Sequence, residues 1–142
     1  MDVKLATSTT DLQRIATVLQ QLRPQFSVAY IEKQIKKQIQ GNYQIAFIEK
    51  NEEVLCVAGF VLGEKLAWGK YIYVDDFVSN ETCRSEGAGK AMVKWLKSYA
   101  TEQGCQQMHL DSGVQRYMAH KFYLREGFII ASHHFSISPL NP

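Results

Sequence analysis

Three consecutive segments rich in apolar and β-branched residues constrain the fold more than any other feature, and they are Tyr43–Ile48, Val54–Leu62 and Tyr71–Val78. Residues 50–53 are polar enough to turn a hairpin between the first two segments, and residues 63–69 are expected to form a loop before the third. Strands joined by such short connections pair antiparallel, because a parallel pair needs a long crossover. The pattern therefore predicts an antiparallel meander.

Helical patterns lie on both sides of this meander. Two helices are expected before it, one capped by Thr9 or Thr10 and ending near Pro24, the other running from Ser27 to Gly41. The remaining expected elements are short strands at 3–6 and 108–110, helices from Gly89 to Gly104 and from Gln115 to Glu126, and a last strand from Phe128 to Ile137. The sequence thus predicts a single α/β domain over residues 1–142, in the order βααβββαβαβ.

Composition limits the expected partners and compartment. Sixteen Lys and Arg residues against fourteen Asp and Glu residues leave a formal charge of +2, which is too small to bind nucleic acid or membranes by charge alone. The sequence has no apolar run of the ~20 residues that a membrane span requires, and residues 1–4 lack the pattern of a signal peptide. We therefore expect a cytoplasmic protein without a nucleic-acid or membrane partner.

The cysteines and histidines lack the spacing of a metal site. Cys56, Cys83 and Cys105 form no C-x-x-C pair, which argues against both a zinc knuckle and a disulfide framework. No two of the four histidines are four residues apart, and the adjacent His133 and His134 would project to opposite faces of a strand. No metal is expected.

A glycine-containing turn, Arg84-Ser85-Glu86-Gly87-Ala88-Gly89, lies where the meander gives way to a helix. Because Gly87 and Gly89 lack Cβ atoms, main-chain N–H groups there can approach a ligand closely, and the first N–H groups of a helix have no partners within it. Such a helix start binds anions, and Arg84 and Lys90 would add positive charge. The alternative is that both glycines only shape a tight turn. A Rossmann fold and a P-loop are excluded, because G-x-G-x-x-G and G-K-[ST] are absent.

The turn resembles the Q/R-x-x-G-x-G/A signature of the GNAT N-acetyltransferase superfamily. Asp75–Val78 precedes Arg84 at the distance usual in that family, and Ala119–Phe128 is similar to its closing A-x-x-(F/L)-Y-x-x-x-G-F element. The resemblance spans most of the second half of the chain. It implies a GNAT-type α/β fold, with a mixed, mainly antiparallel sheet flanked by helices, and an acetyl-CoA-dependent N-acetyltransferase.

The resemblance also implies which residues hold acetyl-CoA. The backbone of Phe77, Val78 and Ser79 would pair with the pantetheine arm, and the turn would hold the pyrophosphate. The implied set is Phe77, Val78, Ser79, Arg84, Ser85, Glu86, Gly87, Ala88, Gly89 and Lys90, with Arg116 and Ala119 on the opposite wall. Two positions depart from the family pattern, because Arg116 stands where many relatives have Asn, and the negative charge of Glu86 must point away from the phosphates.

Three residues are expected to carry the chemistry. Tyr123 sits where the family usually places its general acid, which protonates the departing thiolate. Similarity to the strand of diamine acetyltransferases favours Asp75 as the base or amine anchor, and the Val78 N–H is the expected oxyanion donor. The alternatives are that Tyr123 is a core tyrosine, and that Asp75 and Asp76, which face opposite sides of the strand, are both solvated charges.

The acceptor is expected to be a small primary amine. Ala119–Phe128 and Ser132–Phe135 resemble the C-terminal part of aminoalkylphosphonate N-acetyltransferases, and the acceptor pocket of the family is built largely around the first two helices, here about Leu22–Tyr30. Acetylation of a peptide or protein and a non-catalytic acyl-CoA-binding module stay open as alternatives. Homodimers are common among similar proteins, so a homodimer is possible.

Overall fold

The computed structural model describes residues 1–141, and for residues 84–86 it describes the backbone alone. The chain divides into two compact units, unit 1 (Met1–Leu110) and unit 2 (from Asp111 onward). The single domain expected over residues 1–142 stays a prediction. No helix in the described part of the chain combines the length and the apolar character that a membrane span requires.

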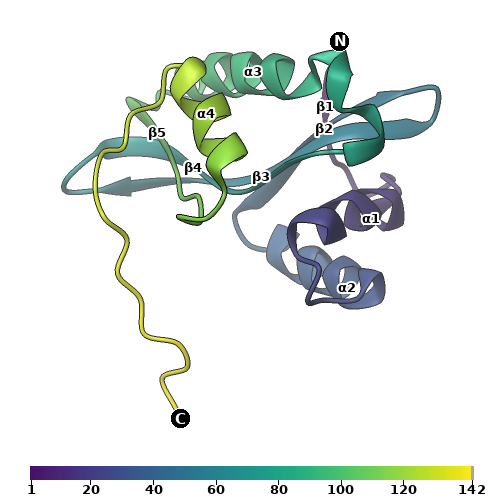
Figure 1. Ribbon diagram of the computed structural model, residues 1–142, viewed down its shortest axis with the longest axis horizontal. Helices are drawn as coiled ribbons and strands as arrows, with labels where there is room; N and C mark the ends of the chain where they lie inside the picture. Colours follow the sequence, from purple (N-terminus) through teal and green to yellow (C-terminus); the bar gives the residue numbers. More distant parts are fainter. Residues whose placement is uncertain (142) are drawn as a thin grey trace. The chain divides into compact units, whose positions relative to one another are not determined.

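Unit 1 is built on one five-stranded sheet (Figure 1). Its strands are β1 (Val3–Leu5), β2 (Tyr43–Lys50), β3 (Glu53–Lys65), β4 (Gly69–Ser79) and β5 (Gln107–Leu110). They lie in the order β1-β2-β3-β4-β5, and every neighbouring pair is antiparallel except β4 and β5, which are parallel. The expected meander is confirmed by β2, β3 and β4, and so is the mixed, mainly antiparallel α/β fold.

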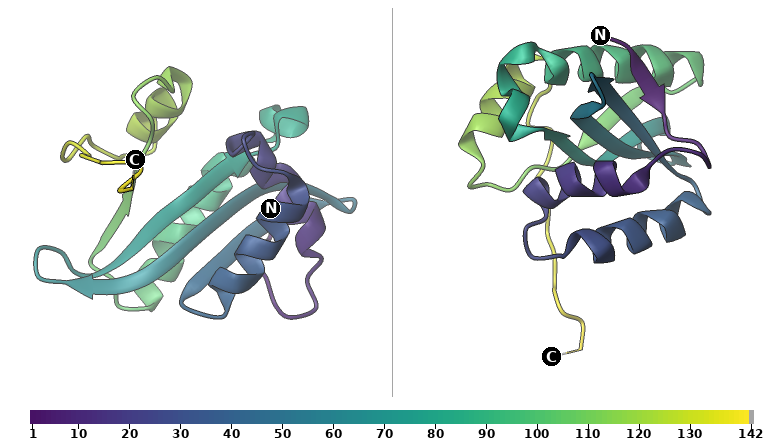
Figure 2. Two further views of the ribbon diagram at one scale, coloured as in Figure 1. Left: turned by 90° about the horizontal axis from the view of Figure 1, so that it is seen from below. Right: turned by 90° about the vertical axis from the view of Figure 1, so that its right-hand side faces the viewer.

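Three helices cover the two faces of the sheet, and they are α1 (Leu12–Leu22), α2 (Val28–Ile39) and α3 (Ala88–Glu102). On one face, Leu19 of α1 and Ile35 of α2 belong to the same buried cluster as Phe47 of β2. On the other face, the rings of Trp95 and Tyr99 of α3 lie 6.3 and 5.7 Å from the ring of Phe60. Figure 2 shows the sheet between the two layers. Because both faces are covered, β3 is buried along most of its length.

A β-bulge shapes the middle of β4. Val74 pairs with Phe60 and Asp76 pairs with Gly59, so that Asp75 is an extra residue in β4. Gly59 lacks a side chain at a point where a Cβ would lie 1.7 Å from the hydroxyl oxygen of Tyr43. The missing Cβ gives the Tyr43 hydroxyl room to reach Asp76, to which it donates a hydrogen bond of 2.8 Å.

Unit 2 contains one helix, α4 (Tyr117–Arg125), followed by residues without regular secondary structure. The strand expected from Phe128 to Ile137 is not formed in the described chain, so the observed order is βααβββαβα apart from a short 3₁₀ helix before α3. Ile129, Ile130, Phe135 and Ile137 are exposed instead. The physical reason is that a strand needs a neighbour to pair its N–H and C=O groups, and alternation of apolar residues does not supply one.

Candidate functional site

The start of α3 is the first part of the site. The 3₁₀ helix η1 (Glu81–Glu86) separates β4 from α3, and Gly87 then adopts the left-handed φ of 75°. The first helical hydrogen bond runs from the Ala91 N–H to the Gly87 carbonyl at 3.1 Å. The N–H groups of Ala88, Gly89 and Lys90 therefore precede the hydrogen-bond ladder of a 15-residue helix and carry the positive end of its dipole. This arrangement can bind an anion.

Asn80 ties this helix start to the sheet, and the sequence interpretation missed it. Its side chain is buried, its Nδ2 donates to the Val54 carbonyl at 2.9 Å, and its Oδ1 accepts from the N–H of Thr82 at 3.1 Å. Its own N–H donates to the Leu55 carbonyl at 2.8 Å. An Asn side chain that accepts a hydrogen bond from the N–H two residues later forms an Asx-turn. Asn is favoured in such turns, so the residue type itself was a weak sequence signal.

The second part of the site is the edge of β4. β5 accompanies β4 only from Tyr71 to Val74, so residues 75–79 have β3 on one side and no β5 on the other. The Asn80 N–H points to β3, and N–H directions alternate along a strand. The Val78 N–H therefore also faces β3, whereas those of Phe77 and Ser79 face the side that β5 leaves open. The oxyanion role expected for Val78 stays a prediction, and this register favours Phe77 and Ser79 as donors at the open edge.

The two acidic residues of β4 differ in exposure and in their contacts, and because Asp75 is the extra residue of the bulge, the alternation expected to place them on opposite faces of the strand does not hold there. Asp76 is largely buried and accepts hydrogen bonds from Arg23 Nε at 3.2 Å, from Arg23 Nη2 at 2.9 Å and from the Tyr43 hydroxyl. Burial first, and then the charge of Asp76, raises the pKa of Tyr43, so this phenol keeps its proton and donates. Asp75 is exposed, and its carbonyl accepts from Arg23 Nη2 at 3.1 Å. Asp76 is therefore committed to a structural network.

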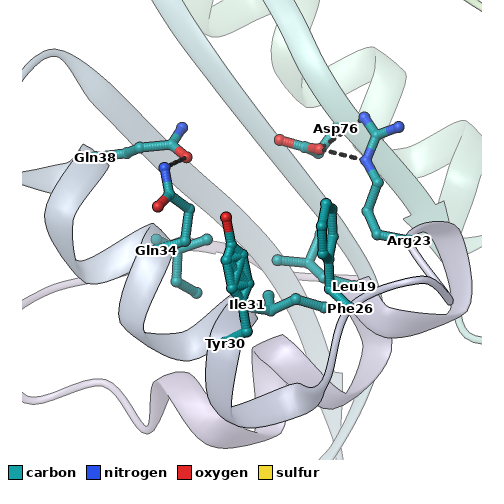
Figure 3. Close-up of a pocket in the computed structure, with 9 residues that line it drawn as sticks. Leu19, Arg23, Phe26, Tyr30, Ile31, Gln34, Gln38 and Asp76 are labelled. Carbon is teal, nitrogen blue, oxygen red and sulfur yellow. Dashed lines mark hydrogen bonds and ion pairs between the residues drawn. The ribbon is translucent and has the colours of Figure 1, made fainter. Parts of the chain in front are cut away.

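A pocket of about 260 Å³ lies between α1, α2 and β4 (Figure 3). Phe26 and Tyr30, whose ring centroids are 4.8 Å apart, are 39 % and 44 % exposed beside it. The whole lining is Leu19, Arg23, Phe26, Tyr30, Ile31, Gln34, Ile35, Gln38 and Asp76. The region around Leu22–Tyr30 that was expected to shape an acceptor pocket thus contributes three of these residues. Sequence interpretation did not identify Arg23, whose partner lies 53 residues away.

The remaining expected residues lie in unit 2. Arg116 is the residue before α4, Ala119 lies in its first turn, and Tyr123 lies near its end. Tyr123 is 8 % exposed, and its ring lies 5.6 Å from the rings of both Phe122 and Phe128. This aromatic contact is what the core-tyrosine alternative expects, and the role of general acid stays a prediction.

Unit 1 thus brings together the open edge of β4, the start of α3 and the acidic pair. The backbone of residues 84–86 lies in η1, and the roles expected for the side chains of Arg84, Ser85 and Glu86 fall outside the described residues. Among the described side chains, no three His, Cys, Asp or Glu residues are grouped to hold a metal ion.

Comparison with known proteins gives a consistent result. Residues 12–128 match the family described as Acetyltransferase (GNAT) family. An uncharacterized N-acetyltransferase of Bacillus subtilis (strain 168), YhdJ, is 25 % identical over 135 residues, which cover 94 % of this chain and 95 % of that protein.

Solved structures share the fold. The aminoglycoside N-acetyltransferase AAC(6')-Iy in complex with CoA superposes with a TM-score of 0.84 at 13 % identity, covering 96 % of this chain and 92 % of that one. A protein described as a transcriptional regulator from Bacillus halodurans C-125 superposes with a TM-score of 0.79 at 20 % identity, covering 96 % and 97 %. At such identities the likeness establishes the architecture, and the site must be argued from its own residues.

Proposed function

The chain belongs to the GNAT acetyltransferase family, and on this premise we propose that it moves an acetyl group from acetyl-CoA to the primary amine of a small molecule by direct attack in a ternary complex. The enzyme class and the acyl donor follow from the family. The observation that carries the proposal is the open edge of β4 leading, in the same unit, to the N–H groups that precede the hydrogen-bond ladder of α3.

Acetyl-CoA, when bound, supplies a thioester and a diphosphate. We propose that the N–H groups of Ala88, Gly89 and Lys90 hold the diphosphate, since they carry the positive end of the α3 dipole. The backbone of Phe77, Val78 and Ser79 would receive the pantetheine arm along the open edge. The expected contributions of Arg84, Ser85, Glu86, Arg116 and Ala119 belong to the same proposal.

The reaction joins the amine nitrogen to the acetyl carbonyl carbon and breaks the carbon–sulfur bond. One amine proton must be removed, and the departing thiolate must receive a proton. Asp75 is proposed as the base or amine anchor, because Asp76 already accepts three hydrogen bonds from Arg23 and Tyr43. Tyr123 is proposed as the acid. Main-chain N–H groups of β4 would stabilise the oxyanion that develops on the carbonyl oxygen.

A small molecule is proposed as the acceptor because the pocket is compact. Its 260 Å³ lies just below the ~300 Å³ at which pockets for drug-sized ligands begin. Solved GNAT-fold structures include AAC(6')-Iy in complex with a bisubstrate analogue of CoA and acetylneamine, which supports small-molecule acceptors on this architecture. Acetylation of an extended peptide would need a longer groove.

We also propose a cytoplasmic homodimer. Ile129, Ile130, Phe135 and Ile137 of unit 2 are all exposed, and a second copy is a partner that could cover such an apolar segment. The three free cysteines support a reducing compartment. Light scattering of the purified protein measures the oligomeric state, and a monomer across the accessible concentrations would remove the dimer.

The test of function is release of the CoA thiol with a panel of amines, measured as a pH–rate profile. Tyr123→Phe is expected to lower kcat roughly 100-fold, because the departing thiolate loses its proton donor. Tyr117→Phe is the matched control on the same helix, since Tyr117 is exposed. Asp75→Asn is expected to move the reaction to higher pH, where the amine loses its proton without help.

The results of these assays distinguish the proposed roles from their alternatives. Turnover by Tyr123→Phe equal to that of Tyr117→Phe would remove the acid role, and an unchanged profile for Asp75→Asn would remove the base. Binding of acetyl-CoA without turnover on any amine would leave the non-catalytic acyl-CoA-binding module in place of the enzyme.

A further inference from the structure

The formal charges in the lining of the pocket cancel. Arg23 and Asp76 are the charged residues among the nine that line it, and they form an ion pair of 2.9 Å (Figure 3). The Asp76 carboxylate also accepts from Tyr43, so most of its hydrogen-bonding capacity is used. Beyond the one amine assigned to Asp75, each further ammonium group of an acceptor would lose water there without gaining a free counter-charge from the lining. The pocket therefore disfavours polycations.

Arg23 keeps unused donors at the β4 side of this pocket. Its Nε and Nη2 hold Asp76, and Nη2 also reaches the Asp75 carbonyl, whereas Nη1 has no hydrogen-bond partner among the described residues. A guanidinium that is fixed at one edge presents its remaining N–H groups in a set direction, which suits a carboxylate. The side chain is 43 % exposed, so a ligand can reach it.

The rest of the pocket is apolar and aromatic. Leu19, Ile31 and Ile35 are buried and belong to the core cluster, so they offer an apolar floor. Phe26 and Tyr30 stand beside each other as its exposed aromatic wall (Figure 3). Gln34 and Gln38 bond to each other at 3.0 Å, which satisfies part of their polar groups. Such surroundings suit one flat or branched apolar group.

We infer that this pocket takes an α-amino acid with an aromatic or branched apolar side chain, whose carboxylate binds Arg23 and whose amine faces β4. In an α-amino acid the amine and the carboxylate are attached to one carbon, so both can lie at the Arg23 end while the side chain covers the apolar floor. The inference rests on the proposed function, and the product is the N-acetyl amino acid with free CoA.

The experiment compares kcat/KM for L-phenylalanine, for phenethylamine, which is the same molecule without the carboxylate, and for the polyamine spermidine. Phenylalanine is expected to exceed phenethylamine by roughly 10- to 100-fold, which is the range for a charge-assisted hydrogen bond. Spermidine is expected to be the poorest of the three. Equal values for phenylalanine and phenethylamine, or a preference for spermidine, would overturn the inference while leaving the acetyltransferase standing.

Variants of Arg23 locate the effect. Arg23→Gln is expected to bring the phenylalanine-to-phenethylamine ratio close to 1, mainly through KM for phenylalanine, and the paired variant Arg23→Gln/Asp76→Asn avoids leaving Asp76 without its cation. Arg14→Gln is the matched control, because Arg14 lies on α1, of which Arg23 is the C-cap, and pairs at 2.8 Å with a strand carboxylate, that of Glu49, but does not line the pocket. It should keep the wild-type ratio.

The outcomes separate the two proposals. A ratio that stays at its wild-type value in both Arg23 variants overturns the inference. Failure of every amine in the panel to release CoA thiol overturns the proposed function and this inference with it. Far-UV circular dichroism and the KM for acetyl-CoA verify that each variant is folded.

Discussion

The two units differ in whether their apolar residues are buried. In unit 1, side chains from α1, α2, β2, β3 and β4 form one buried cluster, and Phe60, Met92 and Leu96 are fully buried between β3 and α3. In unit 2, Tyr123 is the one buried residue among those described, whereas large apolar side chains from Val114 to Leu140 are exposed. Unit 1 has a core of its own, and unit 2 has little beyond one aromatic contact group.

The residues with proposed functions are also divided between the two units. The pocket and the start of α3 lie in unit 1, on elements fixed by a packed core. The residues proposed as the acid and as the opposite wall of the cofactor site lie in unit 2, which is shorter than the ~40 residues below which a chain rarely folds without help. We therefore expect the stability of the protein to reside in unit 1, and the order of unit 2 to depend on association with something else.

The largest expected effect tests where the stability resides. Phe60→Ala removes a fully buried ring that contacts Trp95 and Tyr99, and we expect it to lower the free energy of unfolding by about 3–5 kcal/mol. Phe135→Ala removes the same side chain where it is 88 % exposed, and we expect a change within about 0.5 kcal/mol. Urea unfolding monitored by fluorescence measures both. Similar losses would mean that the residues around Phe135 are as well packed as the core.

A smaller effect is expected at the turn that begins α3. Gly87→Ala places a Cβ in open space but on a left-handed backbone, so strain alone should cost about 1 kcal/mol. Because the strained residue precedes the N–H groups proposed to hold the diphosphate, the dissociation constant for CoA should also rise. Gly41→Ala is the control, because the backbone there has no left-handed φ. Calorimetric titration with CoA and thermal unfolding measure the two quantities.

One result would contradict the proposal that the start of α3 holds the diphosphate. If Gly87→Ala binds CoA as tightly as Gly41→Ala does, the start of α3 is not where the diphosphate rests. The proposal that unit 1 carries the cofactor turn would then fail, while the core of unit 1 would be unaffected.

The sequence predicted those helices and strands in which the spacing of apolar residues reflects which face of the element is buried. The helix stripes and the meander were of this kind, and both are confirmed. The ends of elements were less accurate, because they depend on partners elsewhere in the chain. β3 and β4 extend to Lys65 and Gly69, where the Lys65 ammonium lies 3.3 Å from the Trp68 ring centre and the His109 ring stacks on Trp68 at 3.3 Å. His109 belongs to β5, so the sequence around Lys65 and Trp68 does not indicate this contact.

The site shows the same division. The glycine turn was visible as a motif, since the left-handed backbone that Gly87 adopts is one that favours glycine. Three features of the site were not predicted, namely the η1 helix, the hydrogen bonds of Asn80 and the Arg23–Asp76 ion pair. The ion pair and the bond from Asn80 to Val54 join residues that are distant in sequence. The η1 helix is a turn type with weak sequence preferences. The first helix is capped by Asp11, whose side chain accepts from the Gln13 N–H, rather than by Thr9 or Thr10, since all three residue types suit that position. The strand expected at 128–137 failed because alternation does not specify a partner.

The smallest expected effect compares one ion pair in each unit. In unit 1, hydrogen bonds from Lys4 and from Arg14 lower the pKa of Glu49 below its usual 4.5. A carboxyl with a lowered folded-state pKa stabilises the fold above its unfolded pKa, and that stabilisation is lost as the pH falls through the folded pKa. Glu49→Gln should therefore cost at most about 1 kcal/mol at pH 7, with the difference from wild type shrinking below pH 4.5.

In unit 2, Asp111 pairs with His134 at 2.8 Å, but both side chains are more than half exposed, so Asp111→Asn should change the free energy of unfolding by less than Glu49→Gln does. Urea unfolding of the three proteins at a series of pH values makes the comparison. A difference for Glu49→Gln that stays constant from pH 7 to pH 3 would show that its bonds to Lys4 and Arg14 contribute nothing. A larger loss for Asp111→Asn would place stability in unit 2, where the exposed side chains give no reason to expect it.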